Sequence, residues 1–219
     1  MAGWLVLTVG VVLLLRFVDP PTSMFIIADR IAAWTGAESY PLRHRWVAWH
    51  DISGNAKIAV IAAEDQKFPD HYGFDFESIQ DAIEDRERGG RQRGASTISQ
   101  QVAKNLFLWA DSNWLRKGLE VYFTVLIEAC WSKQRILEVY LNVAEFGRGV
   151  FGVGAASEHF YDKSAGALTP EQAARLAAVL PSPKHYSVAK PGRYVQRRTK
   201  RIQKQMRRLG GTGYLQGVH

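Results

Sequence analysis

The sequence predicts a mainly α-helical domain, and three observations support this fold class. Apolar residues recur at helical spacing through most of the chain after residue 56, and helix start and stop signals separate the segments. Alternating apolar runs long enough for a sheet are missing. A chain of 219 residues can bury a core without disulfides. The single cysteine, Cys130, excludes an internal disulfide and is read as a small buried hydrophobe.

The N-terminal segment is an apolar run from Ala2 to Leu15, extended by Phe17 and Val18 before Asp19 and two prolines. A membrane-spanning helix needs about 20 apolar residues, so the run is borderline in length. No basic cluster precedes it and no Ala-x-Ala-like site follows closely, which favours an uncleaved signal anchor over a signal peptide. We therefore expect one transmembrane helix in residues 1–19. Residues 20–55 are expected to form a connector that packs on the domain.

The main domain is expected in residues 56–190, as a series of helices. They are predicted at 57–64, 76–87, 97–108, 114–131, 133–141, 153–161 and 170–180. Ser96 is expected to cap the third of them, after a basic glycine loop at 89–94. The clearest start signal is Thr169, which is followed by a proline at the first helical position and by Gln172 in the place that a capping box requires.

The charge of the chain is strongly asymmetric. The net charge is +7, but residues 172–219 carry +11 without one acidic residue, whereas residues 1–171 carry −4. Such a segment suits a polyanion, either nucleic acid or an anionic membrane surface. Because the N-terminal run would deliver the domain to a membrane, we expect residues 191–219 to form a basic C-terminal helix or tail that faces lipid headgroups, with no nucleic-acid partner.

An acidic pair, Glu64-Asp65, directly follows the apolar run from Ile58 to Ala63. A carboxylate between an apolar wall and the negative end of a helix should have a raised pKa, as a general acid or base needs. Solvated charges at a helix end are the alternative, and they are favoured if this pair is considered alone.

Two further groups of polar residues suit a sugar phosphate. On a helix from residue 97, one face is polar and the other is apolar; the polar positions are Thr97, Gln100, Gln101, Lys104 and Asn105. Arg116 and Lys117 precede Glu120, and adjacent cations beside a glutamate can neutralise a diphosphate. A surface ion pair at helical spacing explains this second group equally well.

Two short motif matches carry no function. Residues 147–152 fit G-x-G-x-x-G, but they follow a helix and no acidic residue lies about 20 positions on, which excludes dinucleotide binding. Close backbone packing explains these glycines better. Ser187 to Lys190 fits S-x-x-K, but no Lys-Thr-Gly follows, so this match is attributed to chance.

Five ordered sequence blocks together resemble a known family. They are Glu64-Asp65-x-x-Phe68-x-x-His71-x-Gly73-x-Asp75, Gly94-x-Ser96-Thr97-Ile98-x-Gln100-Gln101-x-x-Lys104-Asn105, Arg116-Lys117-x-x-Glu120, Ile136-Leu137-Glu138-x-Tyr140-Leu141-Asn142 and Gly152 to Ala156. Over residues 20–190 the chain resembles the glycosyltransferase domain of class A penicillin-binding proteins in its free-standing form, the monofunctional biosynthetic peptidoglycan transglycosylases. The resemblance implies a lysozyme-like domain with a smaller hydrophobic jaw in the membrane.

The resemblance also implies an activity and its residues. The family polymerises lipid II on the outer face of the cytoplasmic (inner) membrane, with inversion and release of undecaprenyl diphosphate. Glu64 would be the general base and Glu120 the second catalytic carboxylate, near the diphosphate. The implied binding set is Asp65, Phe68, His71, Ser96, Thr97, Gln100, Gln101, Lys104, Asn105, Arg116, Lys117 and Arg148.

One departure from the family bears on the diphosphate site. Some members carry an arginine between Lys104 and Arg116 that this chain lacks. Either Arg148 or a divalent cation, Mg or Mn, is then expected to supply the charge. The implied partners are lipid II, the growing glycan strand, membrane lipids and a separate transpeptidase or cell-wall synthesis complex.

Two competing functions stay open at this point. A lysozyme-like lytic glycosidase would use Glu64 as an acid on finished peptidoglycan. A non-enzymatic binding module would depend wholly on the basic segment, whereas loss of residues 193–208 should cost a polymerase mainly membrane affinity.

Overall fold

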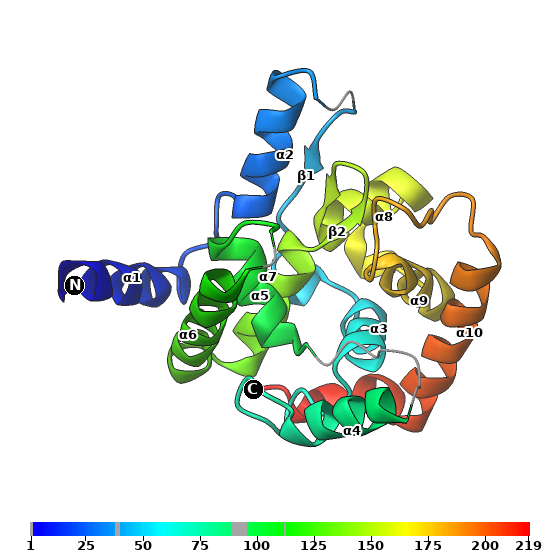
Figure 1. Cartoon of the computed structure of the whole chain (residues 1–219). Helices are drawn as coiled ribbons and strands as arrows, with labels where there is room; N and C mark the ends of the chain where they lie inside the picture. The colour runs from blue at the N-terminus through cyan, green and yellow to red at the C-terminus, as the bar shows by residue number, and fades with distance from the viewer. Residues whose placement is uncertain (1, 38–39, 89–95, 112) are drawn as a thin grey trace.

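The computed structural model describes residues 2–37, 40–88, 96–111 and 113–219. The predicted glycine loop at 89–94 lies outside these residues. Within them the chain forms ten α-helices, so the mainly helical prediction is confirmed (Figure 1). They are α1 (Ala2–Leu15), α2 (Met24–Trp34), α3 (Gly54–Glu64), α4 (Phe76–Glu87), α5 (Ile98–Phe107), α6 (Trp114–Cys130), α7 (Lys133–Val143), α8 (Gly152–Tyr161), α9 (Pro170–Val179) and α10 (Arg193–Arg208).

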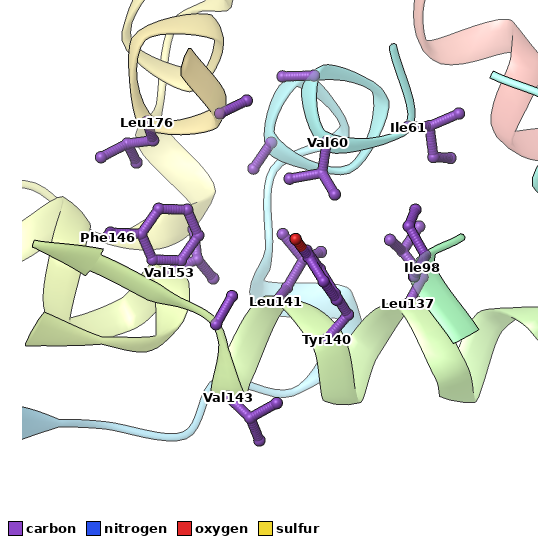
Figure 2. Close-up of a cluster of buried hydrophobic side chains, with 14 of the residues drawn as sticks. Val60, Ile61, Ile98, Leu137, Tyr140, Leu141, Val143, Phe146, Val153 and Leu176 are labelled. Carbon is purple, nitrogen blue, oxygen red and sulfur yellow. The ribbon is translucent and has the colours of Figure 1, made fainter. Parts of the chain in front are cut away.

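Helix α3 is the buried centre of the domain. Every residue from Ala56 to Ala62 is buried, including Lys57, whose ammonium group lies 3.8 Å from the ring centre of Trp49. It packs against α9, α10 and the short 3-10 segment Gly211–Gly217. Val60 and Ile61 point toward Tyr140 and other side chains of α7 (Figure 2). The end of α3 is therefore fixed by packing on several sides.

The C-terminal basic segment is part of this packed body. Val195, Thr199, Ile202 and Met206 follow one another at helical spacing on α10, and all four are buried. Through this face α10 packs against α9 and α3. Removal of residues 193–208 would uncover two core helices, so a loss of stability is expected beside the predicted loss of membrane affinity.

The N-terminal helix α1 is attached to α6 and α7. The Trp131 indole donates a hydrogen bond to the carbonyl oxygen of Val12 (2.7 Å), and the Arg135 guanidinium donates to the carbonyl oxygens of Leu15 (3.1 Å) and Val18 (2.9 Å). Helix α1 has 14 residues. Across the part of the chain that the structure describes, no helix combines the length and apolarity that a membrane span requires. The predicted transmembrane helix is therefore not confirmed.

Helix α2 lies within residues 20–55, where the sequence predicted a connector that packs on the domain. Ser23 caps its start by accepting a hydrogen bond from the backbone N–H of Ile26. Helices α1, α2 and α6 together expose large apolar side chains, which we call the apolar flank. Its most exposed members include Trp34 (88% exposed) and Trp114 (86% exposed). In Figure 1 these three helices lie on the side of the molecule away from α10.

A small sheet was missed by the sequence analysis. Strands β1 (Arg43–His44), β2 (Glu145–Gly147) and β3 (Val150–Phe151) pair in the order β1-β3-β2, with β1 parallel and β2 antiparallel to β3. Strands of two or three residues are too short to give an alternating pattern. Gly152 follows β3 with φ +80°, and a Cβ there would lie 2.7 Å from the carbonyl oxygen of Asn142. Close packing of the glycines is thus confirmed.

Candidate functional site

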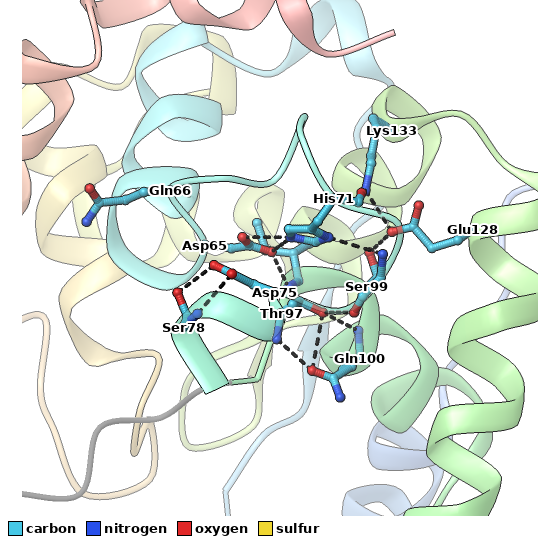
Figure 3. Close-up of polar contacts among 12 residues, drawn as sticks. Asp65, Gln66, His71, Asp75, Ser78, Thr97, Ser99, Gln100, Glu128 and Lys133 are labelled. Atoms are coloured by element: carbon cyan, nitrogen blue, oxygen red, sulfur yellow. Dashed lines mark hydrogen bonds and ion pairs between the residues drawn. The ribbon is translucent and has the colours of Figure 1, made fainter. Parts of the chain in front are cut away.

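Glu64 is the last residue of α3, as the sequence predicted. The helix stops there because the backbone of Asp65 is not helical (φ −158°, ψ 81°) and its side chain is engaged elsewhere. The Asp65 carboxylate accepts a hydrogen bond from the N–H of Ile98 (2.9 Å) at the start of α5 and lies 3.0 Å from Nε2 of His71 (Figure 3). The buried pair of Asp65 and His71 therefore ties the end of α3 to the start of α5.

The Glu64 carboxylate is nearly buried and has two partners. An Arg198 Nη donates to its Oε1 (2.9 Å), and Gln101 Nε2 donates to its Oε2 (3.1 Å). Burial raises the pKa of Glu64 above its ordinary value, while Arg198, Gln101 and Lys104 oppose that rise. A carboxylate in this setting can accept a proton near neutral pH more readily than a solvated one can.

Tyr140 fixes the orientation of the Gln101 amide. The Tyr140 hydroxyl donates to Gln101 Oε1 (3.0 Å), and only 1% of Tyr140 is exposed. Burial raises the pKa of Tyr140 well above its ordinary value, so the hydroxyl keeps its proton. Because the amide oxygen faces Tyr140, the amide NH₂ must face Glu64.

The second carboxylate, Glu120, lies one turn from Arg116 on α6 and forms an ion pair with it. Lys104 of α5 interacts electrostatically with Glu64 as well as with Glu120 and Arg116, and burial lowers its pKa. Lys104 therefore lies close enough to both carboxylates to interact with each of them. Within the described residues, the Nε groups of Arg116 and Arg198 are buried and have no hydrogen-bond partner. Buried N–H groups without a partner are rare in folded proteins, so both groups call for an explanation.

A polar cavity of about 310 Å³ opens beside Glu64. Its lining comes from the end of α3, from α4 and from the residues before α5. The lining residues are Ala63, Glu64, Asp65, Gln66, Lys67, Asp75, Ser78, Asp81, Ser96 and Thr97. A substrate hydroxyl could reach the carboxylate from this side.

The start of α5 differs from the prediction. Thr97, not Ser96, is the N-cap, and it forms a capping box with Gln100. The Thr97 hydroxyl also donates to the carbonyl oxygen of Gly73 (2.6 Å). Thr97 and Gln100 therefore position α5. The residues predicted on the polar face of this helix thus have different roles. Gln101 and Lys104 reach the carboxylates, whereas Asn105 is half-buried farther along the helix.

Two predicted binding residues lie inside the protein. Phe68 is fully buried and packs in the core. His71 is paired with Asp65 and accepts a hydrogen bond at Nδ1 from the N–H of Gly73 (3.1 Å). Figure 3 shows the adjoining network, in which Glu128 accepts hydrogen bonds from Ser99 and Lys133. These contacts give Phe68 and His71 the role of holding residues 65–75 in place.

Two predicted cationic residues, Lys117 and Arg148, contact groups other than Glu120. Lys117 is exposed, with its ammonium group 4.9 Å from the ring centre of Trp114, because adjacent helical residues point in different directions. Arg148 lies between β2 and β3 and donates a hydrogen bond to the carbonyl oxygen of Lys184 (3.1 Å). Neither of these contacts involves Lys104, Arg116 or Glu120.

Sequence reasoning missed Arg198 and Tyr140. The signal for Arg198 was the spacing of Val195, Thr199 and Ile202, which predicts a buried face on this basic helix with Arg198 at its edge. Tyr140 falls within a recognised sequence block, but nothing in that block shows that it meets Gln101.

Known proteins similar to this chain share most of its length. The family model described as transglycosylase matches residues 31–207. The chain is 55% identical over 206 residues to the biosynthetic peptidoglycan transglycosylase of Xanthomonas campestris pv. campestris (strain B100), covering 94% of this chain and 84% of that relative. The relative of the same name from Xanthomonas oryzae pv. oryzae (strain KACC10331 / KXO85) is 57% identical over 205 residues, covering 93% and 84%. The one from Stutzerimonas stutzeri (strain A1501) is 53% identical over 216 residues, covering 98% and 89%.

Proposed function

The chain belongs to the transglycosylase family and is a peptidoglycan glycosyltransferase of cell wall biosynthesis, and from this we propose that Glu64 is its general base. The observation that carries the assignment is the environment of this carboxylate. It is nearly buried, has a raised pKa, is oriented by Arg198 and Gln101, and lines the cavity of the site. These are the properties that a base needs to accept a proton from a sugar hydroxyl.

We propose that the reaction is the polymerisation of lipid II. The 4-hydroxyl of the acceptor sugar would attack the anomeric carbon of the donor while its proton passes to Glu64. The new bond joins the hydroxyl oxygen to the anomeric carbon, and the bond from that carbon to the diphosphate breaks on the opposite face, which inverts the configuration. The leaving group is undecaprenyl diphosphate, and its departure requires stabilisation of negative charge.

Lys104 and Arg116 are proposed to stabilise the leaving diphosphate. Arg116 is held in place by its ion pair with Glu120, which leaves its buried Nε–H without a partner among the described residues. An N–H group of this kind can donate to a phosphate oxygen. Glu120 would therefore act by holding Arg116 and by compensating the charge of Lys104 before substrate binds.

A divalent cation fits the protein side of this site poorly. The described residues contain no group of three or more His, Cys, Asp or Glu side chains that could hold a metal ion, and Glu120 is already paired with Arg116. A cation that takes part would thus be held mainly by oxygens of the substrate diphosphate. No step above depends on it.

The apolar flank is proposed to face the lipid. An enzyme of cell wall synthesis works in the cell envelope, and its substrate would carry a long lipid tail. Exposed large apolar side chains gather on α1, α2 and α6, and contiguous surfaces of this kind are typical of membrane contacts. We propose that this flank is the jaw of a lysozyme-like domain, on the outer face of the inner membrane. A separate transpeptidase would cross-link the product.

The test is a polymerisation assay with labelled lipid II in detergent. Wild-type protein is compared with Glu64→Gln, and each is measured with and without a chelator. We expect glycan polymer from wild type alone, with a loss of about 10²–10⁴-fold in the variant. Polymerisation by Glu64→Gln at the wild-type rate would refute the assignment of the base.

Two controls complete this assay. Circular dichroism and a thermal melt establish that Glu64→Gln is folded. Purified peptidoglycan serves as a second substrate, and its lysis without any polymer formation would replace the proposed function with a lytic glycosidase. A loss of polymer only in the chelator lane would show that a cation accompanies the diphosphate.

A further inference from the structure

One face of α10 carries seven exposed basic side chains, which we call the basic stripe. They are Arg193, Arg197, Lys200, Arg201, Lys204, Arg207 and Arg208. At about 100° of rotation per residue, these positions occupy a stripe about 120° wide along the helix. The buried residues Val195 and Ile202 lie on the opposite side. The stripe is therefore a continuous cationic surface on a helix whose other face is fixed in the core.

The positive charge of the basic stripe is not neutralised by ion pairs among the described residues. Helix α10 has no acidic residue, and in the described part of the chain no ion pair joins any of the seven side chains to a carboxylate. Like charges three and four positions apart on a helix destabilise it by about 0.2–0.5 kcal/mol per pair. A surface that is unfavourable in the isolated protein becomes favourable when an anionic partner covers it.

The stripe begins next to the catalytic site. Arg198 projects between the basic stripe and the buried face of α10, and its guanidinium meets Glu64 (2.9 Å). Glu64 therefore both lines the cavity and contacts α10. The same helix lies on the side of the molecule away from the apolar flank (Figure 1). This position does not fit the expectation that the basic segment faces lipid headgroups, because lipid would lie at the other side.

We propose that the basic stripe binds the nascent glycan strand through the carboxylates of its stem peptides. This inference rests on the proposed function, since it requires a peptidoglycan strand as product. Stem peptides carry free carboxylates at regular intervals along a strand. Helix α10 has 16 residues and is about 24 Å long, so it can line more than one sugar unit. Retention of the strand between additions would favour longer products.

The first experiment measures strand binding without turnover. The stripe variant is Lys200→Glu/Lys204→Glu, which leaves Arg198 intact. The matched control is Arg43→Glu/Lys163→Glu, two exposed basic residues outside α10 with the same change of charge. The probe is a fluorescently labelled, uncross-linked strand with its stem peptides, followed by anisotropy. We expect about tenfold weaker binding by the stripe variant, near wild-type binding by the control, and loss of the difference at high salt.

Two further probes identify the occupant. Strands stripped of their stem peptides should bind wild type and the stripe variant equally, since the carboxylates are gone. Vesicles of phosphatidylglycerol should bind both proteins equally as well. If the stripe variant loses vesicle binding and keeps its affinity for strands, the stripe is a lipid surface and the proposal is overturned. Equal losses in the stripe and control variants would also overturn it, because net charge alone would then explain the effect.

Product length separates this inference from the proposed function. We expect the stripe variant to make polymer from lipid II, but in shorter chains than wild type and control. If wild type makes no polymer, the proposed function itself fails. If wild type and the stripe variant make chains of the same length and bind strands equally, only the inference about α10 fails.

Discussion

Glu64 and Glu120 lie near the same lysine, Lys104, but they obtain their arginine partners in different ways. Glu120 is paired with Arg116 one turn away on the same helix, so the pair can form as soon as α6 forms. Glu64 is paired with Arg198, 134 residues away, and this pair requires α10 to dock onto α3. The ion pair on the side of the leaving group therefore forms within a single helix. The pKa of Glu64, in contrast, depends on the tertiary structure of the whole domain.

The largest effect that sharpens this comparison is expected for Glu120→Gln. Arg116 would lose its carboxylate and its fixed position, and stabilisation of the diphosphate would fall. We expect polymerisation of lipid II to drop by about 10²–10³-fold, as on removal of other preorganised charge-stabilising groups. The acidic limb of the pH–rate profile should stay in place because Glu64 remains the base. A shifted limb would assign the titrating group to Glu120 instead.

A smaller effect, specific to pH, is expected for Arg198→Gln. The guanidinium opposes the rise that burial causes in the pKa of Glu64, so its removal should raise that pKa further. The acidic limb should move toward higher pH, with about tenfold lower activity on that limb and little change at alkaline pH. Arg197→Gln, on the exposed stripe, removes the same charge and serves as control. Equal losses at every pH would show that Arg198 has a structural role only.

A few-fold effect is expected for Tyr140→Phe. Without the hydroxyl, the Gln101 amide can turn its oxygen toward Glu64, and the base loses one donor. We expect kcat to fall about two- to tenfold with KM unchanged. The double variant with Gln101→Ala should be no slower than Gln101→Ala alone. If the two losses multiply instead, Tyr140 acts independently of Gln101.

The smallest effect concerns a half-buried carboxyl that has no part in the proposed reaction. Burial raises the pKa of Glu145 to about 7, so the folded state favours its protonated form. The stability that this gives is present below the ordinary glutamate pKa and is lost as the pH rises through about 7. Allowing for partial solvent access, we expect Glu145→Gln to be more stable than wild type at pH 8 by about 1 kcal/mol, or about 2–4 °C in Tm.

The control for Glu145→Gln is the pH dependence of the same difference. At pH 4.5 both proteins carry a neutral side chain in the folded state, so their Tm values should agree within about 1 °C. Polymerisation should be unchanged at both pH values. A shift of the acidic limb of the pH–rate profile in Glu145→Gln would mean that Glu145, like Glu64, contributes to the titration that controls the rate.

Much of the fold could be predicted because its signals are local. The capping box of Thr169 and Gln172 and the apolar run before Glu64 depend on a few adjacent residues, and the structure has both helix boundaries where the sequence predicted them. The N-cap of α5 was misplaced by one residue, although Thr97 has Gln100 at the spacing that a capping box needs and Ser96 does not.

The unpredicted part of the site depends on packing between distant segments. The meeting of Arg198 with Glu64 follows from the buried face of α10, and the meeting of Tyr140 with Gln101 follows from the crossing of α5 and α7. A list of charges places Arg198 among ten other cations of residues 172–219 and cannot select it. The three short strands were not predicted for a related reason. Their pairing depends on the tertiary structure, and they are too short to show an alternation of apolar and polar residues.

Arg135 and Tyr140 lie on the same helix, α7, and this has a mechanical consequence. Arg135 donates hydrogen bonds to the carbonyl oxygens of Leu15 and Val18 at the end of α1. Little more than one turn later, the Tyr140 hydroxyl orients Gln101. A tensile load applied to the N-terminal segment would therefore reach the helix behind the base without crossing a flexible linker.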